Sequence, residues 1–131
     1  KIFTMKDGKD ITIIASGLMV GQAIIAANML EEEGISVRLL NMHTLKPVDE
    51  ETIIKAAKET GRIIVAENHS ILNGWGSAVC EVVSEHYPVP VVRIGVRDHF
   101  GEVGLTDFLL QKYKMTAKDI YNASKNLLRT K

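Results

Sequence analysis

The stretch Ile11–Met42, ITIIASGLMVGQAIIAANMLEEEGISVRLLNM, predicts a strand, a helix and a second strand in that order. Ile11–Ala15 is continuously apolar, as expected of a strand that is buried on both faces. Leu18–Glu33 is rich in Ala, Leu, Ile and Met, and Gly34 stands where a left-handed residue commonly ends a helix. Ser36–Met42 is typical of the second strand. This spacing predicts two parallel strands joined by a right-handed crossover.

The same alternation continues to the end of the chain. Asp49 is a suitable cap for a helix that ends at Gly61, and Thr116-Ala117-Lys118-Asp119 resembles a capping box that opens a last helix. Between them the apolar patterns predict a strand, a helix and a strand, at 62–66, 75–86 and 91–96. Parallel strands of this kind need helices on both faces of the sheet, so the predicted fold class is α/β.

Two expectations near the first helix rest on neighbouring residues alone. Asp7-Gly8 has the composition of a hairpin turn, so Ile2–Met5 should run antiparallel and pair directly with Ile11–Ala15. Glu31–Glu33 stand at the C-terminal end of the predicted helix, where the helix dipole disfavours negative charge. We therefore expect these glutamates to be solvated and mildly destabilising.

The composition limits the classes of protein to consider. The 131 residues carry 16 basic and 16 acidic side chains, and this balance indicates neither a nucleic-acid partner nor a membrane partner. The one cysteine, Cys80, excludes an internal disulfide framework and fits a reducing compartment such as the cytoplasm. The sequence shows no signal peptide and no apolar run long enough to span a bilayer. It begins at Lys1 without an initiator methionine, so we expect a piece of a longer protein.

A glycine-rich turn, Glu67–Val79 (ENHSILNGWGSAV), is the main candidate for a functional site. A dinucleotide site needs three glycines, and Val79 occupies the third position, so a phosphate site is the weaker interpretation. Glu67 and His69 could form an acid–base pair, but no nucleophile accompanies them. We favour a carboxylate bonded to the backbone and an imidazole at a surface or interface, with Cys80 as a packing residue. The other histidines are too scattered for a metal site: His43, His86 and His99.

Five segments resemble the C-terminal domain of transketolase, in order and over essentially the whole chain. They are Asp10–Gly17 (DITIIASG), Leu40–Asp49 (LNMHTLKPVD), Glu67–His69 (ENH), Gly74–Val79 (GWGSAV) and Arg97–Gly104 (RDHFGEVG). The second and fifth are most similar to the smaller, C-terminal chain of split bacterial transketolases. The resemblance implies a three-layer α/β/α fold with a mixed five-stranded sheet, order 1-3-2-4-5, whose strand 1 is antiparallel. That order disagrees with the direct pairing expected from the Asp7-Gly8 turn.

The resemblance also implies where the chemistry lies. In this family thiamine diphosphate and magnesium are bound by other domains, and this chain lacks the Gly-Asp-Gly motif that holds them. It should therefore contain no catalytic, cofactor-binding or metal-binding residue. The glycine turn becomes a structural and subunit-contact element, and Asn73, at a position that is usually glycine, is expected to adopt positive φ. The candidate interface residues are Glu67, Asn68, His69, Asn73, Gly74, Trp75, Gly76, Asp98, His99 and Phe100.

Together these features favour a non-catalytic C-terminal domain spanning residues 1–131, in which residues 1–9 lead in from a pyrimidine-binding domain. The complete enzyme, a cytoplasmic homodimer, would transfer a two-carbon ketol unit between sugar phosphates, and the isolated chain would be inactive. Its partners would be the pyrimidine-binding and diphosphate-binding domains or subunits of the same enzyme. Two alternatives stay open. One is the same domain of deoxyxylulose-phosphate synthase or of a 2-oxo acid dehydrogenase beta subunit, and the other is an independent module that binds phosphate or nucleotide at Gly74–Gly76.

Overall fold

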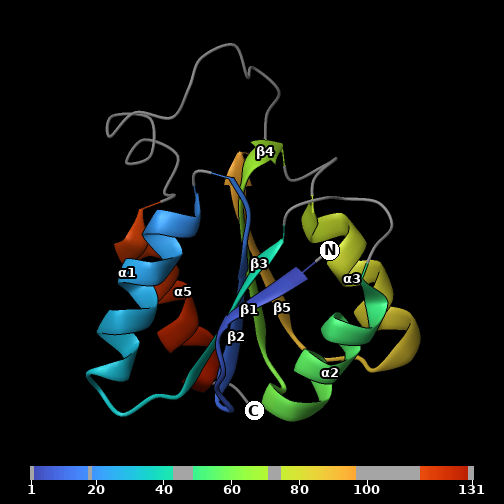
Figure 1. Ribbon diagram of the computed structural model, residues 1–131, viewed down its shortest axis with the longest axis horizontal. Helices are drawn as coiled ribbons and strands as arrows, with labels where there is room; N and C mark the ends of the chain where they lie inside the picture. The colour runs from blue at the N-terminus through green and yellow to red at the C-terminus, as the bar shows by residue number, and fades with distance from the viewer. Residues whose placement is uncertain (1, 18, 43–48, 71–74, 97–115, 130–131) are drawn as a thin grey trace.

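The computed structural model describes residues 2–17, 19–42, 49–70, 75–96 and 116–129. Strands and helices alternate along these ranges in the order that the sequence predicts. They are β1 (Ile2–Lys6), β2 (Ile11–Ala15), α1 (Met19–Glu31), β3 (Val37–Met42), α2 (Glu50–Thr60), β4 (Ile63–Ser70), α3 (Trp75–His86), β5 (Val91–Val96) and α5 (Ala117–Arg129). Figure 1 shows three layers, with the sheet between α1 and α5 on one face and α2 and α3 on the other.

The strands form one sheet in the order β1-β3-β2-β4-β5. β1 runs antiparallel to β3, whereas β3, β2, β4 and β5 are parallel neighbours. This confirms the strand order and the antiparallel first strand that the resemblance implied. The direct pairing of the first two strands, expected from the Asp7-Gly8 turn, is wrong because β3 lies between them.

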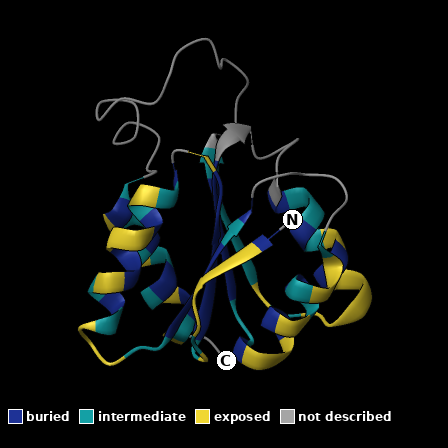
Figure 2. Ribbon diagram, in the orientation of Figure 1, coloured by how far each residue is buried: buried dark blue, intermediate teal, exposed yellow. Residues whose placement is uncertain are grey.

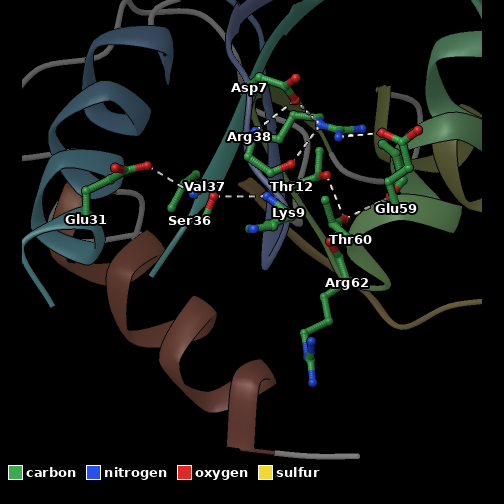
Figure 3. Close-up of polar contacts among 12 residues, drawn as sticks. Asp7, Lys9, Thr12, Glu31, Ser36, Val37, Arg38, Glu59, Thr60 and Arg62 are labelled. Carbon is green, nitrogen blue, oxygen red and sulfur yellow. Dashed lines mark hydrogen bonds and ion pairs between the residues drawn. The ribbon is translucent and has the colours of Figure 1, made fainter. Parts of the chain in front are cut away.

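The chain between β1 and β2 passes over the end of β3 instead of forming a hairpin. Gly8 packs directly on the backbone there, since an added Cβ would lie 2.2 Å from the Val37 carbonyl carbon. Arg38 Nε donates to Asp7 Oδ1 at 2.9 Å and to the Gly8 carbonyl at 3.1 Å. Its Nη2 donates to Glu59 Oε1 of α2 at 2.6 Å (Figure 3). The residues that suggested a hairpin therefore bind β3.

Two apolar layers hold the helices to the sheet. β2 lies at the centre and is buried at all five positions, as its apolar run predicts. Its side chains alternate between the two layers, because Ile13 packs on the α1 and α5 side and Ile14 on the α2 and α3 side. The helices contribute buried residues that include Met19, Leu30 and Ile120 to the first layer, and Ile53, Val79 and Val83 to the second.

The helix ends follow the local signals in the sequence. Asp49 caps α2 by accepting the Thr52 N–H at 3.3 Å, and Gly61 ends the helix with φ 73°. Burial acts to raise the pKa of Asp49, but the hydrogen bonds from Thr52 outweigh it and hold the pKa of the carboxyl below its ordinary value. At the start of α5, Thr116 and Asp119 exchange side-chain-to-backbone hydrogen bonds, which confirms the capping box.

Glu32 and Glu33 at the end of α1 are exposed, as expected, but Glu31 and Glu33 have hydrogen-bond partners, which the expectation of mildly destabilising charges did not include. Glu31 Oε2 accepts the Val37 N–H at 3.0 Å. Glu33 accepts hydrogen bonds from Lys125 and Tyr121 of α5, which hold the pKa of its carboxyl below its ordinary value. These partners belong to other elements, and the pattern around α1 gives no sign of them.

We expect Gly8→Ala to lower the free energy of unfolding by about 1–3 kcal/mol, because the new methyl group must push the β1–β2 connection away from β3. Urea denaturation followed by circular dichroism measures the change. Gly21→Ala is the matched control, since nothing lies within 4 Å of a Cβ at this helical position, and it should raise stability by about 0.5–1 kcal/mol. Equal stabilities of the two variants would contradict the close approach of the connection to β3.

Candidate functional site

The carboxyl ends of β2 and β4 mark the place in this sheet where a site is expected. The two strands are neighbours, and the Ser16 N–H donates to the Ala66 carbonyl at 3.1 Å just beyond the end of β2. The helix that follows β2 covers one face of the sheet, and the helix that follows β4 covers the other (Figure 1). Open α/β sheets bind their ligands where the connections diverge in this way.

Glu67 lies at this position, and its carboxylate is completely buried. β4 extends beyond its predicted end to Ser70, so Glu67, Asn68 and His69 are strand residues. Glu67 Oε2 accepts the Gly76 N–H at 3.0 Å in the first turn of α3. A negative charge is favourable there, because a helix N-terminus carries a partial positive charge and free N–H groups. This confirms the interpretation of Glu67 as a carboxylate bonded to the backbone.

Gly76 brings the first turn of α3 against β4 and β5. A Cβ added to it would lie 2.4 Å from Arg93 Nε and 3.0 Å from Glu67 Oε2. Arg93 stands opposite Val65 in the ladder between β5 and β4, and its Nη2 donates to Ser77 Oγ at 3.0 Å. The lack of a side chain at Gly76 thus allows the helix backbone to pack closely against both a carboxylate and a guanidinium. We call Glu67, Gly76, Ser77 and Arg93 the Glu67–Arg93 cluster.

Arg93 is the member of this cluster that the sequence analysis missed. The available signal was a lone charged residue in an apolar strand, VVRIGV. A charge in a strand that helices cover needs hydrogen-bond partners or an opposite charge nearby. Its Nε faces Gly76 and is buried without a hydrogen-bond partner among the described residues, and the carboxylate of Glu67, which approaches the same side of Gly76, is the opposite charge in the cluster.

Cys80 lies about one turn beyond the cluster in α3 and is partly buried. Burial raises the pKa of its thiol, the charge of Arg93 lowers it and the charge of Glu67 raises it, with a net increase. Since the thiolate is the nucleophilic form, a raised pKa makes this cysteine less reactive than an ordinary one. This agrees with its interpretation as a packing residue.

The other candidates from the sequence are placed only in part. Asn68 and His69 continue the backbone of β4, and Trp75 begins α3. His86 is exposed at the end of α3, with its Nε2 3.8 Å from Glu50 Oε1, away from the cluster. The remaining candidates lie outside the described residues: His43, Asn73 with its expected positive φ, Gly74, Asp98, His99 and Phe100. The subunit-contact role of the interface candidates stays a prediction.

In the described part of the site, hydrogen bonds from β4 and β5 hold the first turn of α3 in place. The carboxylate of Glu67 already accepts a hydrogen bond from the Gly76 N–H. A phosphate that binds at a helix N-terminus needs free N–H groups of this kind. Within the ranges that the structure describes, no group of three His, Cys, Asp or Glu side chains could hold a metal ion. The arrangement can therefore anchor the end of β4 and the first turn of α3, the two elements that flank residues 71–74 in the sequence.

Comparisons with known proteins agree with one another. A family model described as "Transketolase, C-terminal domain" matches residues 1–120. The 6-deoxy-6-sulfo-D-fructose transketolase subunit SqwH of Clostridium sp. (strain MSTE9) is 48% identical over 124 residues, 95% of this chain and 38% of that protein. The 1-deoxy-D-xylulose-5-phosphate synthase of Heliobacterium modesticaldum is 40% identical over 124 residues, 94% of this chain and 19% of that protein. A solved structure described as "Split gene transketolase, inactive beta4 tetramer" has a TM-score of 0.89 and 47% identity, covering 98% of this chain and 41% of that one. The chain thus spans less than half the length of these relatives.

We expect Glu67→Ala to lower the free energy of unfolding by about 2–3 kcal/mol, because it removes a charged acceptor from a buried N–H and takes away the carboxylate that lies near Arg93. Glu67→Gln keeps an acceptor and should cost less. Urea denaturation measures both changes. Glu85→Ala, at an exposed position of the same helix, is the control and should change stability by less than about 0.5 kcal/mol. Equal effects of Glu67→Ala and Glu85→Ala would show that the carboxylate does not anchor α3.

Proposed function

Because the chain belongs to the transketolase C-terminal domain family, we propose that it forms one domain, residues 1–131, of a transketolase and has no catalytic residues of its own. Its relatives include a transketolase subunit and a 1-deoxy-D-xylulose-5-phosphate synthase. The similarity to split transketolase chains in both sequence and structure favours a transketolase over a 1-deoxy-D-xylulose-5-phosphate synthase. The complete enzyme would transfer a two-carbon ketol unit from a ketose phosphate to an aldose phosphate.

The observation that carries this proposal is that the buried carboxylate of Glu67 and the partly buried guanidinium of Arg93 both bind the chain itself. Glu67 accepts the Gly76 N–H, and Arg93 donates to Ser77. A phosphate-binding turn needs free N–H groups and a positive field at the start of the helix, whereas Glu67 supplies a negative charge there. A phosphate- or nucleotide-binding module at Gly74–Gly76 is therefore the weaker alternative.

Thiamine diphosphate and magnesium are implied for the complete enzyme by its family. The described residues of this chain do not fit that cofactor, because Glu67 would repel a diphosphate at α3 and no described group of carboxylates or histidines could hold the metal ion. We therefore assign the cofactor to other domains or subunits, where it would supply the carbanion stabilisation that ketol transfer requires. The contribution of this chain would be to hold a contact surface in position.

The proposed partners are the pyrimidine-binding and diphosphate-binding domains or subunits of the same enzyme, in a homodimeric assembly. One relative is named as a subunit and another as a tetramer, and the chain spans less than half of each, which supports a function within an assembly. Glu67 is buried, so it would act by fixing the turn between β4 and α3. Gly76 is buried as well and would act in the same way, so direct contact would come from the other interface candidates, namely Asn68, His69, Asn73, Gly74, Trp75, Asp98, His99 and Phe100.

The described helices give no indication of a membrane anchor. Across the ranges that the structure describes, no helix is both long enough and apolar enough to cross a lipid bilayer. A cytoplasmic location is part of the proposal and is supported by the low cysteine content, Cys80 alone.

We expect the isolated chain neither to bind thiamine diphosphate with magnesium nor to convert sugar phosphates, because the cofactor site is assigned to other domains. Calorimetric titration measures the binding, and a ketol-transfer assay measures the turnover. Adding the domains or subunits that carry the cofactor should produce turnover that the chain alone does not show. Binding of thiamine diphosphate to the isolated chain at micromolar concentration would contradict this assignment.

In the complete enzyme we expect Trp75→Ala to weaken association between subunits, since an aromatic residue at a contact often carries about 2 kcal/mol or more of binding. Sedimentation velocity should show dissociation, and raising the enzyme concentration should restore the rate. Tyr87→Ala is the control, because this exposed aromatic residue lies beyond the other end of α3. A Trp75→Ala enzyme that stays assembled but loses turnover at saturating cofactor and substrate would instead indicate a catalytic role for the turn.

A further inference from the structure

A small polar pocket lies between β1, β3 and α2. Its volume is about 140 Å³, which is enough for several water molecules or for one small ligand. Figure 2 shows β1 as an exposed strand at the edge of the sheet, so solvent reaches the pocket from this side. The pocket is lined by two residues from each of three segments, namely Thr4 and Asp7, Arg38 and Leu40, and Thr52 and Lys55. We call it the Arg38–Lys55 pocket.

The fold brings these residues together on the α2 side of the sheet. Leu40 packs in the layer of α2 and α3, and Arg38, two residues earlier in the same strand, points the same way. Thr4 stands opposite Leu40 in the antiparallel ladder, so its side chain is on this side as well. Arg38 and Leu40 are buried, so they form the inner wall of the pocket, while Lys55 is exposed on α2.

Three side chains around the pocket have hydrogen-bond donors without a partner among the described residues. Arg38 uses its Nε for the β1–β2 connection and its Nη2 for α2 (Figure 3), which leaves the two N–H groups of Nη1. Within the ranges that the structure describes, Lys55 Nζ forms neither a hydrogen bond nor an ion pair, and the hydroxyl of Thr4 forms no hydrogen bond. The pocket therefore offers donors that a ligand could use.

The charges of the lining favour an anion. Arg38 and Lys55 are positive, and Asp7 is the one negative group among the six lining residues. The side chain of Asp7 is 80% exposed, so water weakens its repulsion of a bound anion, whereas the guanidinium of Arg38 is buried and its attraction is weakened less. Guanidinium, ammonium and hydroxyl groups are donors with which proteins recognise phosphate.

We propose that the Arg38–Lys55 pocket binds a phosphate group, either as inorganic phosphate or as a phosphate monoester. Arg38 Nη1, Lys55 Nζ and the hydroxyl of Thr4 would donate hydrogen bonds to its oxygens. These donors come from three different elements, so a tetrahedral acceptor meets more of them than a planar carboxylate does. The pocket lies beside the edge strand β1, whereas the glycine turn follows β4, on the other side of β2. The inference therefore goes beyond the proposed function and does not depend on it.

The test is a titration of the isotope-labelled chain with inorganic phosphate at constant ionic strength, followed by NMR chemical shifts. We expect saturable shifts of the backbone amide signals of Thr4, Arg38, Thr52 and Lys55. The dissociation constant should be about 1 mM, since the ligand is small and the pocket is open to solvent. A second titration with glycerol phosphate distinguishes the two sources of the group, because a monoester site binds it more tightly than inorganic phosphate and a site for the free anion does not.

Two variants test the donors. Lys55→Gln should raise the dissociation constant for phosphate at least about fivefold, because it removes a charged donor. Lys58→Gln is the matched control, since it makes the same change in net charge at an exposed residue of the same helix outside the pocket, and it should leave the dissociation constant unchanged. Thr4→Val keeps the shape of the side chain and should also weaken binding. Lys55 and Thr4 are exposed, so the variants should fold, and circular dichroism checks this.

Four results would overturn the proposal. Phosphate could cause no saturable shifts at concentrations far above the expected dissociation constant. Lys55→Gln and Lys58→Gln could bind it equally well, which would indicate a general attraction to the surface of α2. Acetate could bind as tightly as phosphate, which would show that the pocket does not select a phosphate group. Finally, the shifts could centre on Gly76 and Ser77, which would place the anion at α3 and count against the proposed function as well.

Discussion

A buried guanidinium lies where the first three strands meet. Arg38 is 8% exposed and bonds to Asp7 and Gly8 of the β1–β2 connection and to Glu59 of α2. A buried charge costs several kcal/mol unless hydrogen bonds and opposite charges surround it, so the connection and the end of α2 must both stay close to β3. β3 can lie between β1 and β2 only when their connection passes over its amino end. The lack of a side chain at Gly8 leaves room for that path over Val37.

The two ends of the parallel strands are held in different ways. At the amino ends, polar contacts join neighbouring elements, as Figure 3 shows: Thr12 and Thr60 share a buried hydrogen bond of 2.8 Å, and the Lys9 N–H donates to Ser36 Oγ at 3.1 Å. At the carboxyl ends, the Glu67–Arg93 cluster ties the first turn of α3 to β4 and β5. Both ends of the strands are therefore fixed by contacts within the chain, between connections at the amino edge and at a helix N-terminus at the carboxyl edge.

A carboxylate buried at the switch point of an α/β sheet has the position of a catalytic residue. Here its hydrogen bond goes to a helix N-terminus, and the neighbouring guanidinium bonds to a serine of the same helix. Position in the fold alone does not distinguish catalysis from structural support, so the partners of each charge have to be considered as well. Since the chain spans less than half of these relatives, surfaces that other parts of an assembly could cover matter as much as internal sites.

Features that depend on a few adjacent residues were predictable without coordinates. The apolar run of β2 indicated burial on both faces, and Asp49 and Gly61 marked the ends of α2, because periodicity and helix capping act over a turn or less. The hairpin expected at Asp7-Gly8 failed because the same two residues bind Arg38, which lies in a strand that the local pattern did not place beside them. Glu67 could be predicted to bond the backbone, but its bond to Gly76 and the presence of Arg93 beside it required the packed structure. Local backbone preferences are properties of short segments, whereas the partner of a buried charge depends on which strands and helices pack together.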